Sequence, residues 1–215
     1  LLFGDDSTGT IDGANYNTGV GDNVFGALTT GDHNTLTGYN SGASITSGEN
    51  NTLFGSTSGD ALTTGGTNTV VGSNALSTDT QGSLSTAIGY QALNAQNFSS
   101  ATDSHNTAVG YQAGLAVTTG IHNTIVGSRA GDAFTDADFN TAIGANALTG
   151  DTQGSRSVAI GRGALAVQNF TSATDTYNTA VGFGAGVSVT TGIENTIIGG
   201  DAGDALTDAD YNVAL

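Results

Sequence analysis

Short runs of alternating polar and apolar residues recur along the whole chain, and each run closes on a glycine. Residues 106–110 are NTAVG, and residues 123–127 are NTIVG. The residue before the glycine is usually Val or Ile, which favour strands, and nearby TTG tripeptides such as residues 118–120 are typical of tight turns. The pattern predicts one short strand ending at each glycine, with turns leading to the next strand.

The spacing of these closing glycines predicts the architecture. Successive copies lie 17 or 21 residues apart, and the two longer units contain QNFSSATD at residues 96–103 and QNFTSATD at residues 168–175. Residues 82–143 also match residues 154–215, without gaps, at 41 of 62 positions. The closing glycines are Gly21, Gly38, Gly55, Gly72, Gly89, Gly110, Gly127, Gly144, Gly161, Gly182 and Gly199. Repeats of this length are typical of solenoids, and 17 residues cannot hold two helices with their turns. We therefore expect an all-β fold, a parallel β-solenoid of about twelve 17-residue coils, two of them expanded to 21, forming a single repeat domain over residues 1–215.

Each expected strand has two different faces, because successive strand residues point to opposite sides. The residue before the glycine shares one face with a Thr, and an Ala or Ile shares the other face with an Asn. Both faces are apolar near the glycine, which is typical of a strand buried on both sides. Since a thin coil has one interior, we expect a neighbouring subunit to cover the second face. The Asn side chains of successive coils should hydrogen-bond one another as a ladder. This column includes Asn106, Asn123 and Asn140.

Composition narrows the possible functions. The chain has 34 Gly, no Cys and a net charge of -16, and its three basic residues are Arg129, Arg156 and Arg162. So few cations exclude nucleic-acid binding and docking on anionic membranes. The absence of Cys excludes disulfides and thiolate catalysis, and no apolar run is long enough to span a membrane. Because 37% of the residues are hydrophobic, a disordered acidic tail is also excluded.

The motifs resemble those of known fibrous proteins. NTAVG, NTAIG and SVAIG (residues 157–161) resemble the head repeats of trimeric autotransporter adhesins. The longer phrase NTAVGYQAG…TTG…NTIVGSRAGDA is similar to repetitive tail-fibre proteins of phages. The resemblance implies a left-handed parallel β-roll, three chains packed into a fibre, and an extracellular or virion-surface location. It implies a non-enzymatic fibre segment that acts as a rigid spacer and in host attachment, with an adhesin head or stalk as the alternative. The coils of 17 and 21 residues are longer than those usual in adhesin heads. Because the sequence begins without Met and stops within a motif, we expect it to be part of a longer fibre.

The three His residues are the first candidates for catalysis. His33, His105 and His122 all lie immediately before the Asn position of the motif. In other coils the same position holds residues as different as Arg156 and Glu194. A catalytic His needs a fixed partner, so a position that changes chemistry from coil to coil indicates a variable, solvent-facing edge. We expect no enzymatic activity.

Aromatic residues gather at two positions of the coil. Tyr39, Tyr90, Tyr111 and Phe183 follow closing glycines, and Tyr177 lies in the His column. Rings along one edge could stack on sugars of a cell-surface glycan. They could also pack over one another as a ladder that shields the coil corner, which is common at β edges. Both hypotheses stay open at this point.

Paired acidic residues suggest a metal site. Asp136 and Asp138 lie in DAFTDADFN, and Asp208 and Asp210 lie in DALTDADYN. In a strand, alternating Asp side chains would share a face, and the spacing resembles the start of a calcium loop. The required Gly and Glu are missing, since Thr141 and Ala147 occupy their places. The alternatives are a calcium site and a solvated acidic turn; no other cofactor is expected.

An ice-binding surface would need a regular, flat, outward-facing array of Thr. The adjacent Thr residues of the TTG corners lie on opposite faces, and their column is interrupted at residues 79–81 and 136–137. The corner sequence therefore argues against that function.

Overall fold

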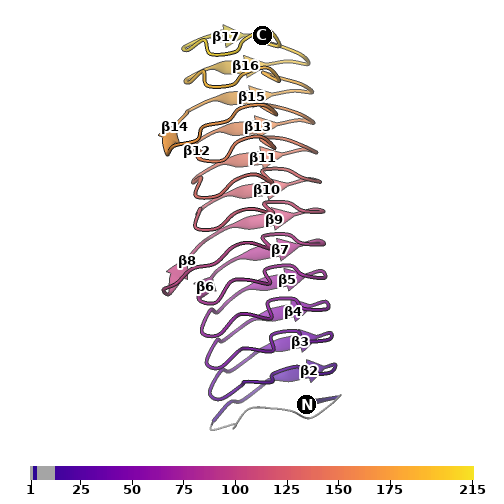
Figure 1. Ribbon diagram of the computed structural model, residues 1–215. Helices are drawn as coiled ribbons and strands as arrows, with labels where there is room; N and C mark the ends of the chain where they lie inside the picture. Colours follow the sequence, from indigo (N-terminus) through magenta and orange to yellow (C-terminus); the bar gives the residue numbers. More distant parts are fainter. Residues whose placement is uncertain (1, 4–12) are drawn as a thin grey trace. The chain divides into compact units, whose positions relative to one another are not determined.

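The computed structural model describes residues 2–3 and 13–215 and shows an all-β parallel β-solenoid of about twelve turns (Figure 1). The described residues contain no helix, and so none that could cross a membrane. The chain divides into two compact units, Leu1–Asn106 and Thr107–Leu215. The fold class predicted from the glycine spacing is confirmed, whereas the trimer and the handedness stay predictions.

In the first unit each coil contributes one strand to a parallel sheet. The strands are β1 (Leu2–Phe3), β2 (Thr18–Val20), β3 (Thr35–Thr37), β4 (Thr52–Phe54), β5 (Thr69–Val71) and β7 (Thr86–Ile88). Pairing joins equivalent residues of successive coils, for example Leu36 with Leu53. The expanded coil adds a second pair, β6 (Gly82–Ser83) with β8 (Thr102–Asp103), and Figure 1 shows β8 projecting at the side of the coil.

The second unit repeats this arrangement. Its main sheet consists of β9 (Thr107–Val109), β10 (Thr124–Val126), β11 (Thr141–Ile143), β13 (Val158–Ile160), β15 (Thr179–Val181), β16 (Thr196–Ile198) and β17 (Val213–Ala214). The QNFTSATD segment ends in β14 (Thr174–Asp175), which pairs with β12 (Gly154–Ser155). The two 21-residue coils thus accommodate their extra residues outside the main sheet.

The middle residue of each strand points into the coil, and its two neighbours point outward. Leu53 and Val70 are buried, while Phe54 is 58% exposed and Val71 is 36% exposed. The structure thereby decides which of the two apolar faces is the interior. The inner face is the one shared by the Ala or Ile and the Asn, and the large residue before each glycine lies outside.

Close stacking explains the closing glycine. Its φ lies between 129° and 148° in the eleven copies, a region that only glycine adopts readily. At Gly72 a Cβ would also collide with the backbone carbonyl of Gly89 in the next coil. The glycine column therefore allows successive coils to approach at this corner.

The position before the Asn column is left-handed in every described coil. Its φ lies between 50° and 64°, although none of these residues is glycine. They are Tyr16, His33, Asn50, Thr67, Leu84, His105, His122, Phe139, Arg156, Tyr177, Glu194 and Tyr211. This backbone conformation, which the sequence did not predict, turns the chain from the corner into the strand.

Candidate functional site

The variable column before the Asn forms stacks on the outside of the coils. Tyr16 and His33 are parallel with ring centroids 4.8 Å apart, and His122 and Phe139 are parallel at 4.9 Å. The guanidinium carbon of Arg156 lies 4.8 Å from the centre of the Phe139 ring. Because His122 and Arg156 come from the coils before and after, they cover both faces of Phe139. Here the ladder hypothesis describes the contacts better than sugar stacking does.

The aromatic residues after the glycines form a second group on the surface. Tyr39, Tyr90, Tyr111 and Phe183 are all exposed. The guanidinium carbon of Arg162 lies 5.6 Å from the centre of the Phe183 ring, a cation–π contact. Tyr177 lies in the other column, where its ring centre is 5.9 Å from the guanidinium carbon of Arg156. Sugar binding at the exposed rings stays a prediction.

The paired acidic residues lie in loops between strands, so their side chains do not share a strand face. Asp138 accepts a hydrogen bond from the backbone N–H of Ile121 at 2.7 Å, and Asp210 accepts one from Ile193 at 2.8 Å. Asp136 and Asp208 accept bonds from the preceding Thr hydroxyls. Within residues 2–3 and 13–215, no three His, Asp or Glu side chains gather in a way that could hold a metal ion. The calcium site stays a prediction that would need further ligands.

Burial is the main influence on the Asp138 carboxyl. It raises the pKa of Asp138 above its usual value, and the nearby charge of Asp136 raises it further. This pKa is lowered by the hydrogen bond from the Ile121 N–H and by the nearby His122 and Arg156. The Asp138 carboxylate thus accepts a backbone hydrogen bond although its burial disfavours the charged form. This combination fits a structural role in the loop.

The Asn ladder lies in the interior of the coils. The Asn51 amide donates to Asn34 Oδ1 at 3.1 Å and to the Gly65 carbonyl at 3.0 Å, and Asn51 Oδ1 accepts from the Asn68 backbone N–H at 3.0 Å. Asn140 continues this pattern in the second unit by donating its backbone N–H to Asn123 Oδ1. Each side chain therefore ties its own coil to both neighbours and satisfies buried backbone groups.

A buried polar network, which the sequence did not predict, replaces the ladder where Ser85 stands in the Asn column. The Gln96 amide donates to Asp79 Oδ2 at 2.7 Å and to Ser85 Oγ at 2.8 Å. Gln96 Oε1 accepts from Asn106 Nδ2 at 2.9 Å. All four residues are buried. The second unit repeats the network with Asp151, Gln168, Ser157 and Asn178. The available sequence signal was the Ser at the Asn position, followed eleven residues later by a Gln.

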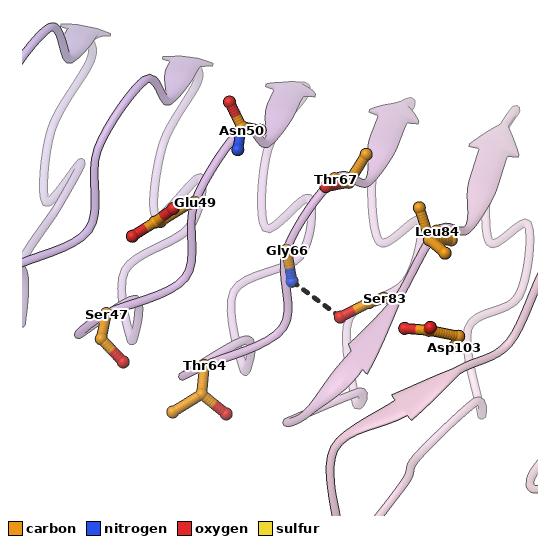
Figure 2. A pocket seen from close by; sticks show the side chains of 9 residues that line it. All are labelled: Ser47, Glu49, Asn50, Thr64, Gly66, Thr67, Ser83, Leu84 and Asp103. Carbon is orange, nitrogen blue, oxygen red and sulfur yellow. Dashed lines mark hydrogen bonds between the residues drawn. The ribbon is translucent and has the colours of Figure 1, made fainter.

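A groove of about 410 Å³ on the first unit is lined by polar and charged side chains (Figure 2). Three neighbouring coils and β8 form it. Its lining consists of Ser47, Glu49, Asn50, Thr64, Gly66, Thr67, Ser83, Leu84 and Asp103. The Gly66 N–H donates to Ser83 Oγ at 3.0 Å across its floor. Hydroxyl and carboxylate groups thus dominate a site that the sequence did not indicate.

Comparison of the chain with protein-family models, curated proteins and solved structures finds no match.

Proposed function

We propose that this chain is a non-enzymatic structural segment of an extracellular fibre, in which the outer face of the sheet packs against other copies of the chain. A homotrimeric virion appendage such as a phage tail fibre is the assembly that fits its repeats best, and a head or stalk segment of a bacterial adhesin is the alternative. The fibre would act as a stiff spacer, with host-surface attachment through its exposed aromatic residues.

The observation that supports this proposal is the apolar row on the outer face. In the first unit Val20, Phe54 and Val71 are exposed, and in the second unit Ile160 and Ile198 are exposed. Burying a side chain of this size stabilises association by about 1.5–3 kcal/mol before the entropic cost of binding. The row is interrupted at Thr37 but supplies such contacts on most coils. A Thr row beside it adds hydroxyls for hydrogen bonds between subunits.

The charge distribution agrees with a fibre. A net charge of -16 keeps neighbouring fibres apart in solution, because like charges repel. Trypsin-like proteases also have only three basic residues at which to cut. A spacer outside the cell benefits from both properties.

Sedimentation velocity tests the proposal on the wild type and on Val71→Asp, with Thr119→Asp as a control at an exposed corner away from the sheet. We expect a trimer for the wild type and for Thr119→Asp. For Val71→Asp we expect a smaller species with an unchanged β circular-dichroism spectrum. A folded, monomeric wild type at micromolar concentration would contradict the proposal.

A second candidate function uses the same face. Thr35, Thr52 and Thr69 are exposed and pair in register along the sheet. This row lies in the strands and not at the TTG corners, and it is regular and outward-facing, so it favours an ice-binding surface. Thermal hysteresis measured on the wild type and on Thr52→Lys separates the candidates. Hysteresis that is lost in Thr52→Lys supports ice binding, and its absence from the wild type rejects it.

A further inference from the structure

One surface site has the same backbone arrangement in both units but carries different side chains in each. Residues 72 apart are equivalent: Ser83 pairs with Asp103 in the first unit, and Ser155 pairs with Asp175 in the second. A backbone N–H donates to each serine, from Gly66 at 3.0 Å and from Asp138 at 3.0 Å. The second unit therefore indicates which chemical group this backbone arrangement can hold.

In the second unit this position is filled by a guanidinium group. Arg156 Nε lies 3.0 Å from Asp175 Oδ1, and the Arg156 guanidinium carbon lies over the Phe139 ring. It also lowers the pKa of Asp138, as a nearby positive charge does, although burial raises that pKa overall. The site thus holds a flat cation between an aromatic ring and carboxylates.

In the first unit the corresponding side chains are shorter or uncharged. Leu84 stands in place of Arg156, Thr67 in place of Phe139, and Asn50 in place of His122. The carboxylate partner is kept as Asp103. Gly66 replaces Asp138, and Glu49 supplies a second carboxylate where the other unit has Ile121. The result is the groove of 410 Å³. Figure 2 shows Asp103 beside Ser83 and Leu84 at one end of the groove and Glu49 toward the other.

The first unit has no Lys or Arg side chain that could neutralise these carboxylates, and its histidines are His33 and His105. Among the described residues, Glu49 and Asp103 form no ion pair. The groove therefore combines negative charge, hydroxyl acceptors and free volume at the place where the other unit holds its own Arg side chain.

We propose that this groove binds a guanidinium group, which would occupy the position that Arg156 fills in the second unit. A planar guanidinium suits the site because it can donate to a carboxylate and to hydroxyls at once, which a compact ammonium does less well. The group can come from a free small molecule or from an Arg side chain of a partner protein. The site lies at the coil corner, away from the outer sheet face, so the inference does not depend on self-association.

Titration of the full chain, followed by the NMR shifts of its backbone amides, tests the proposal. The probes are methylguanidinium chloride and the peptide Gly-Arg-Gly, with Gly-citrulline-Gly as an uncharged control of similar shape. We expect saturable shifts at Gly66, Ser83 and Asp103 with the Arg peptide and none with the citrulline peptide. Binding of methylguanidinium alone indicates a small-molecule site, whereas binding of the peptide alone indicates a partner's side chain. Failure of both cations to bind, or equal binding of the citrulline peptide, overturns the proposal.

Two variants locate the binding. Leu84→Arg supplies the internal group, so it should abolish binding and form an ion pair with Asp103. Asp103→Asn should weaken binding by about two- to fivefold, the effect of one exposed charge pair. Asp175→Asn is the matched control in the second unit and should leave binding unchanged. Unaltered affinity in a folded Leu84→Arg protein, or loss of binding in Asp175→Asn, would place any bound cation elsewhere and refute the site.

Discussion

Replacing Gln96 with Leu tests how far stability depends on the buried polar network. The wild-type side chain donates to Asp79 and Ser85 and accepts from Asn106, at distances of 2.7, 2.8 and 2.9 Å. Leu has a similar size but none of these hydrogen bonds. The Asp79 carboxylate would keep only its bonds from the Gly82 and Phe98 backbone N–H groups.

The expected cost follows from what remains buried. A hydrogen bond to a charged group contributes about 1.5–3 kcal/mol, and an unsatisfied buried polar group costs about 1–3 kcal/mol. The apolar side chain of Leu recovers part of this loss, because other coils have Leu62 or Val117 at the same place. We expect Gln96→Leu to lower the local free energy of unfolding by about 3–5 kcal/mol.

Hydrogen exchange followed by mass spectrometry is the suitable assay, because a repeat array can open locally without unfolding throughout. Amides between residues 79 and 106 should exchange faster by about two to three orders of magnitude. Gln168→Leu should act in the same way on residues 151–178. Gln81→Leu is the matched control, since Gln81 makes only a long, exposed bond to the Ser99 carbonyl at 3.4 Å. If Gln96→Leu and Gln81→Leu change exchange equally, the network does not stabilise the coil as reasoned.

Three further predictions concern other parts of the coil. Gly72→Ala should destabilise the fold by at least about 2 kcal/mol through backbone strain and collision with the next coil. Gly200→Ala should not, because a Cβ at that position would have open space around it. Denaturant unfolding of the two variants measures the difference. Burial raises the pKa of Asp60 in the folded protein above its value in the unfolded chain. The free energy of unfolding should therefore fall as the pH rises between these two pKa values. Asp60→Asn should therefore be more stable than wild type at pH 7, and an unchanged pH dependence of melting would contradict this. Replacing both Tyr90 and Tyr111 with Ser should abolish glycan-array binding without loss of β structure if these rings read a sugar, and should leave the array result unchanged if they only shield the corner.

Much of the fold could be predicted because stacking imposes the same demand on every coil. Only a glycine such as Gly72 combines its φ of 139° with close approach of the next backbone, so the 17- and 21-residue periods are visible in the sequence. The Asn ladder was predictable for the same reason, since Asn51 must match Asn34 and Asn68 in register. Identical contacts in successive coils require identical residues.

The candidate site was less accessible, because it depends on differences between coils. In a strand, alternating Asp residues would share a face, whereas Asp138 lies in a loop and accepts a hydrogen bond from the Ile121 N–H. The groove arises where Leu84 and Thr67 are shorter than their equivalents Arg156 and Phe139. Such a site is visible only when side chains as far apart in sequence as Ser47 and Asp103 are placed side by side.

From the residues alone one can deduce the period, the strand positions and the separation of side chains into two faces, since these follow from short-range backbone geometry. The choice of interior could not be deduced, because Leu53 and Phe54 are both apolar and only the direction in which the coil closes buries one and exposes the other. The exchange of the Asn ladder for the Asp79–Gln96 network is likewise a property of the closed coil. There, desolvation favours pairing of the buried donors and acceptors of this network, whatever their distance along the chain.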